Sequence, residues 1–324
     1  SAMLGLLGGL FLGAVFVIAR ERYDRTIHNP EDAGFYLGLS ELGIIPSATA
    51  GRSRLYYGRR RRRGQGMALP QGTALPHKEA EEEDCVELVT LKHRSSSLAE
   101  SFRATLTSIL FSSQNGNRPK VLVLTSATAA EGKTTIASNL GVALAEAGQK
   151  VLIIDGDLRK PRLHEIFGLA NDLGLSDLLR DRNAAVGEAA RGLIRETSVP
   201  GLALLPAGPH TAAATNLLYS PQLPELLKAV RPEYDMVLID TPPMLQIADA
   251  RVLGRLADAV VLIIRSGRTT RDAAQAARDR LVEDGIPVLG AILNDWDPRG
   301  GTGYGYHGYY DRYRYYHYRE GEGN

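Results

Sequence analysis

A short phosphate-binding signature constrains this chain more than any other stretch. Residues 127–135 read Ala-Thr-Ala-Ala-Glu-Gly-Lys-Thr-Thr, between an apolar run at 121–124 and a segment at 136–147 with helical apolar spacing. A strand, a loop of small residues and a helix in this order are typical of a P-loop, in which backbone N–H groups and the helix dipole bind phosphate. Lys133 then supplies a mobile cation, and the hydroxyl of Thr134 can bind Mg²⁺.

One position departs from the usual pattern G-x-x-x-x-G-K-[ST], because Ala127 replaces the first glycine. The rest of the loop still predicts a nucleotide site, with the backbone of residues 130–135 around the phosphates. We assign Asn294 to the same site; it directly follows the predicted last strand at 288–293. The residues expected to bind the nucleotide are therefore Ala130, Glu131, Gly132, Lys133, Thr134, Thr135 and Asn294.

Two further apolar runs end in aspartates. The run at 151–154 ends in Asp155, and Asp157 follows two residues later, so that both side chains point to the same side. The run at 236–239 ends in Asp240, the position at which P-loop enzymes hold Mg²⁺ or its water. Because ligands bind at the carboxyl ends of parallel strands, we expect these carboxylates to lie beside the P-loop.

Composition sets broad limits on the function. The chain has 324 residues, of which 44% are hydrophobic, so it can form one large domain with extensions. The formal net charge of +1 gives no global bias toward nucleic acid, and no nucleic-acid partner is expected. Cys85 is the only cysteine, which excludes an internal disulfide and suits a reducing cytoplasm.

An uncharged N-terminal stretch predicts a membrane span. Residues 2–19 would form a helix about 27 Å long, close to the ~30 Å thickness of the hydrocarbon core. Arg20, Arg22 and Arg25 follow at once, which places that flank in the cytoplasm. A buried core helix is the alternative. A span that begins at the first residue suggests that the chain is a piece of a longer protein.

Blocks of like charge follow the predicted span. Residues 59–63 are five arginines and residues 79–84 are mostly acidic, a composition typical of solvated, flexible chain, although the arginines also suit anionic lipid head groups. Residues 39–46 suggest a short ordered piece. We predict four parts: a transmembrane helix at 1–19, a juxtamembrane linker at 20–95, a P-loop domain at 96–298 and a tyrosine-rich flexible tail at 299–324.

Strand and helix patterns alternate from residue 97 onward. Ser97 and Glu100 have the spacing of a capping box at the start of a helix. Further strands are expected at 202–206, 259–264 and 288–293, with helices between them. The alternation predicts an α/β, P-loop NTPase-like fold, with a mostly parallel sheet and helices on both faces, preceded by the transmembrane helix and the linker.

The C-terminal tail concentrates eight of the chain's 14 tyrosines. No period of a strand or helix fits them and no aliphatic residue lies among them, so a low-complexity, sticky tail is one interpretation. Beside a nucleotide site, phenols on a flexible segment are also accessible phosphoryl acceptors. These candidate acceptors are Tyr304, Tyr306, Tyr309, Tyr310, Tyr313, Tyr315, Tyr316 and Tyr318.

Taken together, these features resemble the bacterial tyrosine kinases of exopolysaccharide and capsule export, in which a polysaccharide co-polymerase membrane domain is fused to a cytoplasmic kinase. The resemblance rests on residues 20–32 and 42–46, on the Asp-x-Asp-x-Arg motif at 155–159, on Asp-Thr-Pro-Pro at 240–243 and on the tyrosine cluster. It implies an ATP- and Mg²⁺-dependent protein tyrosine autokinase that phosphorylates its own cluster between subunits and regulates polysaccharide chain length or export.

The same resemblance implies a location and partners. The chain would sit in the inner (plasma) membrane with its kinase domain in the cytoplasm. Its partners would be other copies of itself, the membrane, the polysaccharide polymerisation and export machinery, and a tyrosine phosphatase.

Separate roles follow for the site residues. Asp155 or Asp157 would orient the tyrosine hydroxyl and accept its proton, and Arg159 would steady the developing phosphate charge. An aspartate is a weak base for a phenol of pKa ~10, which matters less where proton removal comes late. The expected catalytic residues are Lys133, Asp155, Asp157 and Arg159, and the expected metal ligands are Thr134, Asp155 and Asp240.

Three departures from the family pattern leave other functions open. Residues 129–130 are Ala-Ala where the family commonly has Pro-Gly, Leu106 breaks a Glu-x-x-Arg-x-x-Arg motif linked to ring assembly, and residues 213–216 replace a typical Asn-Pro-x-Glu stretch. A nucleotide-binding switch without kinase activity is therefore one alternative. A positioning ATPase of the Min or Par type is the other, although its signature lysine would fall at Thr128 and it would lack the span and the tyrosine tail.

Overall fold

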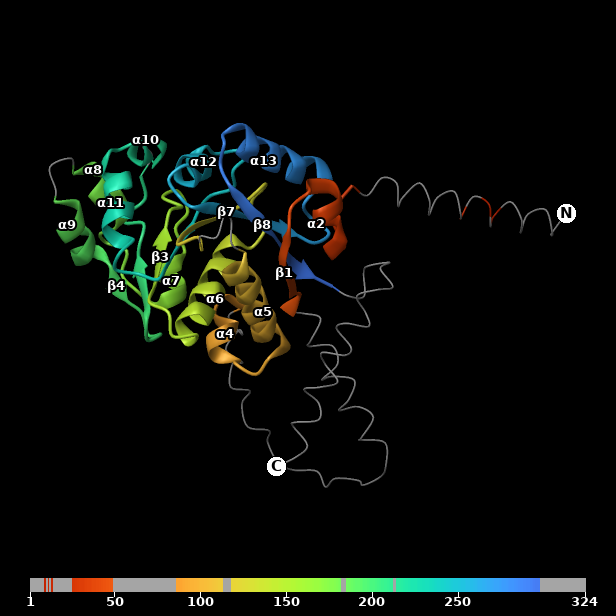
Figure 1. Cartoon of the computed structure of the whole chain (residues 1–324), viewed down its shortest axis with the longest axis horizontal. Coiled ribbons are helices and arrows are strands. Elements are labelled where there is room, and N and C mark those ends of the chain that lie inside the picture. Colours follow the sequence, from red (N-terminus) through yellow and green to blue (C-terminus); the bar gives the residue numbers. More distant parts are fainter. Residues whose placement is uncertain are drawn as a thin grey trace, which may run out of the picture.

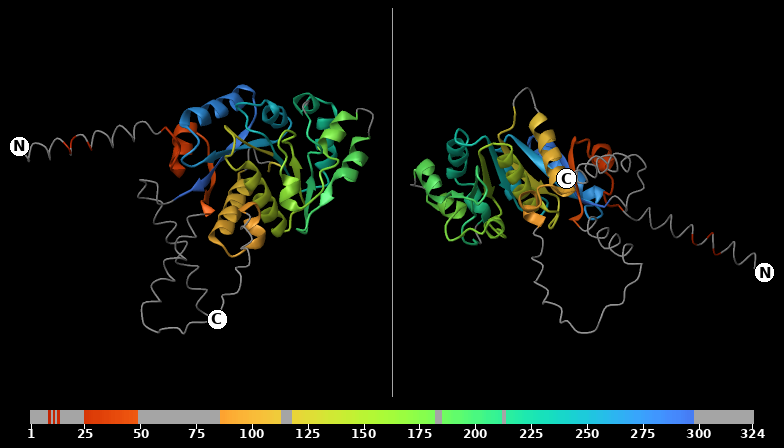
Figure 2. Two further views of the ribbon diagram at one scale, coloured as in Figure 1. Left: turned by 180° about the vertical axis from the view of Figure 1, so that it is seen from behind. Right: turned by 90° about the horizontal axis from the view of Figure 1, so that it is seen from below.

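The computed structural model describes residues 25–48, 86–112, 118–181, 185–211 and 214–297, together with Gly9, Phe11 and Gly13. These residues form one sheet with helices on both of its faces (Figure 1). Figure 2 shows the same layers from behind and from below.

The sheet has eight strands in the order β1-β8-β7-β2-β6-β3-β5-β4. All neighbouring strands run parallel except β4, which pairs antiparallel with β5. The mostly parallel α/β sheet predicted from the sequence is thus confirmed. The strands are β1 (Glu41–Pro46), β2 (Val121–Ser126), β3 (Val151–Asp155), β4 (Arg195–Glu196), β5 (Leu202–Leu205), β6 (Met236–Asp240), β7 (Ala259–Arg265) and β8 (Val288–Trp296).

The central strands are apolar on both faces because helices cover both. In β2, Val121 and Val123 join the hydrophobic cluster on one face, while Leu122 and Leu124 join the cluster on the other. This alternation follows from the two-residue period of a strand. With both faces apolar, polar groups on these strands are confined to their ends, which is where the predicted aspartates lie.

Two groups of helices cover the sheet. The first face packs against α2 (Pro30–Leu37), α8 (Leu175–Arg180), α9 (Val186–Leu193), α10 (Ala214–Leu218), α11 (Gln222–Val230), α12 (Asp249–Gly254) and α13 (Arg271–Glu283). The second face packs against the 3₁₀ helix η1 (Val86–Leu88) and the helices α4 (Val89–Lys92), α5 (Ser97–Phe111), α6 (Lys133–Glu146) and α7 (Leu163–Phe167).

The linker predicted for residues 20–95 is too broad, because parts of it belong to the sheet and its helix layers. Helix α2 packs on one face, and β1 adds an edge strand parallel to β8. Buried apolar side chains explain the difference, since Ile27, Leu37, Leu42 and Ile45 are all at most 3% exposed. Strand β1 lies within the short ordered piece that the sequence suggests at 39–46.

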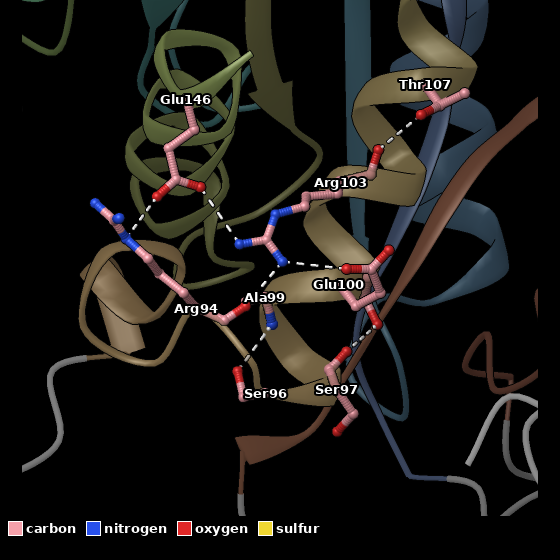
Figure 3. A network of polar contacts seen from close by, with 9 residues as sticks. Arg94, Ser96, Ser97, Ala99, Glu100, Arg103, Thr107 and Glu146 are labelled. Atoms are coloured by element: carbon pink, nitrogen blue, oxygen red, sulfur yellow. Dashed lines mark hydrogen bonds and ion pairs between the residues drawn. The ribbon is translucent and has the colours of Figure 1, made fainter. Parts of the chain in front are cut away.

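The start of α5 differs from the predicted cap by one residue. The N-cap is Ser96, whose Oγ accepts a hydrogen bond from the Ala99 N–H at 3.1 Å, so Ser97 is already helical (Figure 3). Glu100 instead forms an ion pair with Arg103 at 3.1 Å, and Arg103 also reaches Glu146 on α6 at 3.3 Å.

Leu106, the residue that breaks the assembly motif, is 6% exposed and packs in the hydrophobic cluster with α6. Its side chain therefore stabilises the fold of this chain.

Two predicted segments lie outside the described residues. They are the membrane span at 1–19, apart from Gly9, Phe11 and Gly13, and the tyrosine-rich tail at 299–324. Across the described parts of the chain, the helices are all too short or too polar to traverse a bilayer.

Gly43→Ala tests whether β1 is an integral part of the fold. A Cβ atom on Gly43 would lie 1.9 Å from Oγ1 of Thr105 in α5, so the two elements would have to separate. We expect the free energy of unfolding to fall by about 1–3 kcal/mol. Gly34→Ala is the matched control, since a Cβ in that helical position meets no atom within 4 Å. Urea unfolding measures both, and unchanged stability of Gly43→Ala would contradict the packing of β1 on α5.

Candidate active site

The strand order brings the predicted site residues to one edge of the sheet. Strands β2, β6 and β3 are neighbours and run parallel, so their carboxyl ends lie side by side. The P-loop follows β2, whereas Asp240 and Asp155 are the last residues of β6 and β3. Three segments therefore meet at the place where such sheets bind ligands, although Thr134 and Asp240 are 106 positions apart.

The loop between β2 and α6 has the geometry of a phosphate-binding turn. Gly132 is the N-cap of α6, with a φ of 92° that favours glycine, and Ala130 has a φ of 60°, which is uncommon for a residue with a Cβ atom. Helix α6 begins at Lys133, so its first N–H groups are turned toward this edge. The strand–loop–helix order predicted from the sequence is thus the order in the structure.

Two side chains of the first turn of α6 point at neighbouring strands. The Nζ of Lys133 donates to Oγ of Ser126 at 3.2 Å, and the Oγ1 of Thr134 donates to Oδ2 of Asp240 at 2.6 Å. Lys133 is only 8% exposed, which keeps its charge in a region of low dielectric. Thr134 and Asp240 are therefore close enough to act on one ion.

Asp155 and Asp240 are direct partners in the register of β3 and β6, and both carboxyl groups are buried. Burial raises the pKa of Asp155 well above its ordinary value, and the nearby charge of Asp240 raises it further. Burial also raises the pKa of Asp240 to about 6, although the hydrogen bond from Thr134 and the charge of Lys133 act in the opposite direction. Two buried carboxyl groups thus lie side by side, and this arrangement favours the binding of a cation beside them.

The donor atoms fit Mg²⁺ only when other oxygens complete its shell. Oδ1 of Asp240 is buried and has no hydrogen-bond partner, although buried carboxylate oxygens are usually paired. Yet the described residues contain no group of three or more His, Cys, Asp or Glu side chains that could hold an ion by themselves. An ion here would take Thr134, Asp240 and, directly or through water, the neighbouring Asp155, and would draw the rest from phosphate oxygens and water.

Asp155 and Asp157 differ in their surroundings. Oδ2 of Asp155 accepts from the N–H groups of Arg162 at 3.2 Å and Leu163 at 3.1 Å. Asp157 is half-buried, and its Oδ1 accepts from the N–H groups of Arg159 at 3.1 Å and Lys160 at 3.0 Å. Asp157 is therefore the carboxylate of this pair that an incoming side chain can reach.

Arg159 is held by two residues that the sequence analysis missed. Its Nε donates to Oδ2 of Asp249 at 3.3 Å and its Nη2 donates to Oγ1 of Thr215 at 2.6 Å. Thr215 in turn donates to Oδ1 of the fully buried Asp249 at 2.7 Å. Asp249 is the first residue of α12, and acidic residues at a helix start usually act as caps, while Thr215 lies in the 213–216 stretch that departs from the family pattern.

The remaining predicted nucleotide residues are also brought to this edge. The carbonyl of Ala130 accepts from Nη1 of Arg265 at 2.8 Å, and that of Glu131 accepts from Nδ2 of Asn294 at 2.9 Å. Thr135 lies in the first turn of α6. The side chain of Glu131 is fully buried and turned away from solvent. The eight tail tyrosines lie outside the described residues.

Comparisons with known proteins give a consistent result. A family model described as an AAA domain matches residues 120–275. The tyrosine-protein kinase YwqD of Bacillus subtilis (strain 168) is 39% identical over 215 residues, which are 66% of this chain and 88% of the relative. The tyrosine-protein kinase Etk of Escherichia coli (strain K12) is 30% identical over 94% of this chain, but that match spans only 40% of Etk.

Among solved structures, the kinase domain of the Escherichia coli tyrosine kinase Etk aligns with a TM-score of 0.68 at 28% sequence identity. The alignment covers 86% of this chain and 99% of that domain.

The raised pKa of Asp240 predicts how stability depends on pH. A carboxyl that binds its proton more tightly in the folded state favours folding below its ordinary pKa, and the contribution is lost as the pH rises through the folded value. Without metal and nucleotide, the free energy of unfolding should therefore fall as the pH rises from 3.8 to about 6.

Asp240→Asn removes this ionisation and should stabilise the metal-free protein at neutral pH by up to roughly 3 kcal/mol. Denaturant unfolding between pH 4 and 8 in the presence of a chelator measures the effect. The exposed Asp172→Asn is the control and should keep the original pH dependence. An Asp240→Asn protein with the same slope as the unchanged chain would contradict the buried, raised carboxyl.

Proposed function

Because this chain belongs to the family of bacterial tyrosine-protein kinases, we propose that it transfers the γ-phosphoryl group of ATP to tyrosine hydroxyls, including those of its own C-terminal cluster. The acceptors would be the eight tyrosines between Tyr304 and Tyr318. The observation that carries the proposal is the pair Asp155 and Asp240, which lie side by side next to Lys133 and Thr134 of the P-loop. This arrangement suits phosphoryl transfer, which depends on positioning and on charge neutralisation.

The P-loop would bind the polyphosphate. The backbone N–H groups of residues 130–135 and the N-terminus of α6 would surround the phosphate oxygens. Lys133 would leave its contact with Ser126 and pair with the β- and γ-phosphates. A bound Mg²⁺ would supply charge stabilisation for the phosphate oxygens, and Thr134, Asp240 and Asp155 would hold it directly or through water.

The acceptor side of the site would be formed by residues 155–159. Asp157 is the more accessible of the two carboxylates there, and we assign to it the orientation of the tyrosine hydroxyl and the acceptance of its proton. The fully buried Asp155 is better placed for the metal. Arg159, fixed by Asp249 and Thr215, would direct its remaining N–H groups toward the transferred phosphoryl group.

The wider role rests on the relatives. The chain spans about 40% of the length of Etk, so the activity and partners of the whole relative enter as proposals. We place the kinase domain on the cytoplasmic side of the inner membrane, where it would phosphorylate other copies of itself and regulate exopolysaccharide or capsule export, with a tyrosine phosphatase reversing the modification. The arginine-rich flank after residue 19 supports this orientation.

Lys133→Met should abolish the kinase activity. The change removes the cation that faces the β- and γ-phosphates, so we expect phosphotyrosine formation to fall by at least about a hundredfold with the fold intact. Anti-phosphotyrosine blotting of the purified chain with ATP and Mg²⁺ measures it. Lys228→Met alters an exposed lysine on α11 and should leave the signal unchanged. Phosphotyrosine that persists in Lys133→Met would place the activity elsewhere.

Replacing all eight tail tyrosines by phenylalanine tests the acceptor. The tail variant should gain no phosphate on the tail, because phenylalanine has no hydroxyl, while its binding of Mg–ADP should stay the same. Intact mass before and after phosphatase treatment counts the phosphates. If the variant carries as many phosphates as the unchanged chain, the tail is not the substrate.

A further inference from the structure

A second set of contacts holds the P-loop from outside and meets at the side chain of Glu131, away from the proposed phosphoryl transfer. Oε1 of the fully buried Glu131 accepts hydrogen bonds from Oγ1 of Thr128 at 2.7 Å and from Oγ1 of Thr269 at 2.8 Å. Oε2 of Glu131 is buried without a hydrogen-bond partner. A buried carboxylate in a loop that must receive phosphates is unfavourable by itself, so its presence calls for a structural reason.

Thr269 connects this carboxylate to the loop that follows β7. Its hydroxyl accepts from the backbone N–H of Arg265 at 2.9 Å while it donates to Glu131, so both of its hydrogen-bonding functions are used. The guanidinium of Arg265 returns to the P-loop at the carbonyl of Ala130 and also binds Asp295. A closed ring of hydrogen bonds therefore joins the P-loop residues Ala130 and Glu131 to Thr269 and Arg265.

The loop that carries Thr269 is itself fixed to the fold. The carbonyl of Thr269 accepts from the N–H of Ile27 at 2.9 Å, and the carbonyl of Ile27 accepts from the N–H of Gly267 at 2.8 Å. Ile27 is fully buried and Thr269 is 1% exposed. Thr269 is thus an anchor of defined position on the outer side of the P-loop.

The P-loop needs such an anchor because its backbone is strained. Ala130 has a φ of 60° and Gly132 has a φ of 92°, on either side of Glu131. A non-glycine residue in this region costs of order 1–2 kcal/mol and persists only where its surroundings fix it.

Two carbonyl contacts also set the direction of the loop's N–H groups. In a planar trans peptide, the N–H points opposite to the carbonyl of the preceding residue. Arg265 and Asn294 bind the carbonyls of Ala130 and Glu131 from outside, so the N–H groups of Glu131 and Gly132 turn the other way. These N–H groups belong to the segment that would bind phosphate.

We propose that Thr269 is a positioning residue for the nucleotide. Its hydrogen bond to the carboxylate of Glu131 holds the strained P-loop in the conformation that receives the phosphates. This rests on the proposed function to the extent that the P-loop must bind a nucleotide. Glu131 provides the acceptor that joins the loop to Thr269 and Thr128, which accounts for a carboxylate at this position. Thr269 itself touches no atom of the proposed reaction.

The test compares Thr269→Val and Thr269→Ser in the full chain. Valine has the shape of threonine but can neither donate to Glu131 nor accept from the N–H of Arg265, whereas serine keeps the hydroxyl for both. We expect the dissociation constant of Mg–ADP, measured by titration calorimetry, to rise about tenfold in Thr269→Val and to stay within about twofold in Thr269→Ser. In the kinase assay, the KM for ATP should rise more than kcat falls, because phosphate contacts act in both the bound and the transition state.

Two controls separate positioning from general destabilisation. Thr105→Val makes the same change in a fully buried threonine of α5, whose hydroxyl donates to the carbonyl of Ser101 in the same helix, and should leave Mg–ADP binding unchanged. Thr128→Val removes the local donor to Glu131 but leaves the connection to Thr269, so its effect should be smaller than that of Thr269→Val. Thermal unfolding shows that each variant is folded, and Thr269→Ala replaces Thr269→Val if the latter is not.

The outcomes are distinct. The proposal would be overturned if Thr269→Val bound Mg–ADP with unchanged affinity, or if Thr269→Ser lost as much affinity as Thr269→Val. In either case the hydroxyl of Thr269 would have no role. If the chain without any substitution bound no Mg–ADP, the proposed nucleotide site would be contradicted together with the positioning role of Thr269. A loss confined to Thr269→Val and reversed by serine supports it.

Discussion

Two buried carboxyl groups on neighbouring strands determine the electrostatics of the proposed active site. Asp155 and Asp240 lie opposite each other at the ends of β3 and β6, where burial raises the pKa of both. Such a pair destabilises the ligand-free fold, because neither charge is fully compensated. Lys133 and the hydroxyl of Thr134 offset part of this cost, and a cation with polyphosphate would offset the rest. The instability is thus concentrated where the proposed ligand would bind.

The surrounding sheet makes this concentration possible. Strands β2, β3 and β6 are buried on both faces by aliphatic side chains, so that polar groups occur only at their ends. The same packing holds the P-loop and the two aspartates in fixed positions relative to each other. The P-loop is then held from outside by Arg265 at the end of β7, Thr269 in the loop after it and Asn294 on β8. Pre-organisation of this kind lets N–H groups act on phosphate without reorganising at the moment of reaction.

The parts of the site that could be predicted from the sequence are those in which local pattern and chemistry coincide. The aliphatic runs that end in Asp155 and Asp240 can be recognised within a few residues of sequence. The same is true of the spacing of Lys133 and Thr134 in the P-loop. The roles of Asp249 and Thr269 depend on contacts across 90 and 138 positions, which no local pattern reveals. The sequence suggests a short ordered piece at 39–46 but not its place in the sheet, since the pairing of β1 with β8 joins residues about 250 positions apart.

The proton balance of ligand binding tests the central claim most directly. If Asp240 and Asp155 hold protons more tightly than ordinary carboxyls, a cation bound beside them must drive those protons off. Titration of Mg–ADP into the protein at pH 6, in two buffers with different ionisation enthalpies, gives the number of protons released. We predict a release by the unchanged chain that is larger than the release by Asp240→Asn. Equal proton release by the two proteins would contradict the account.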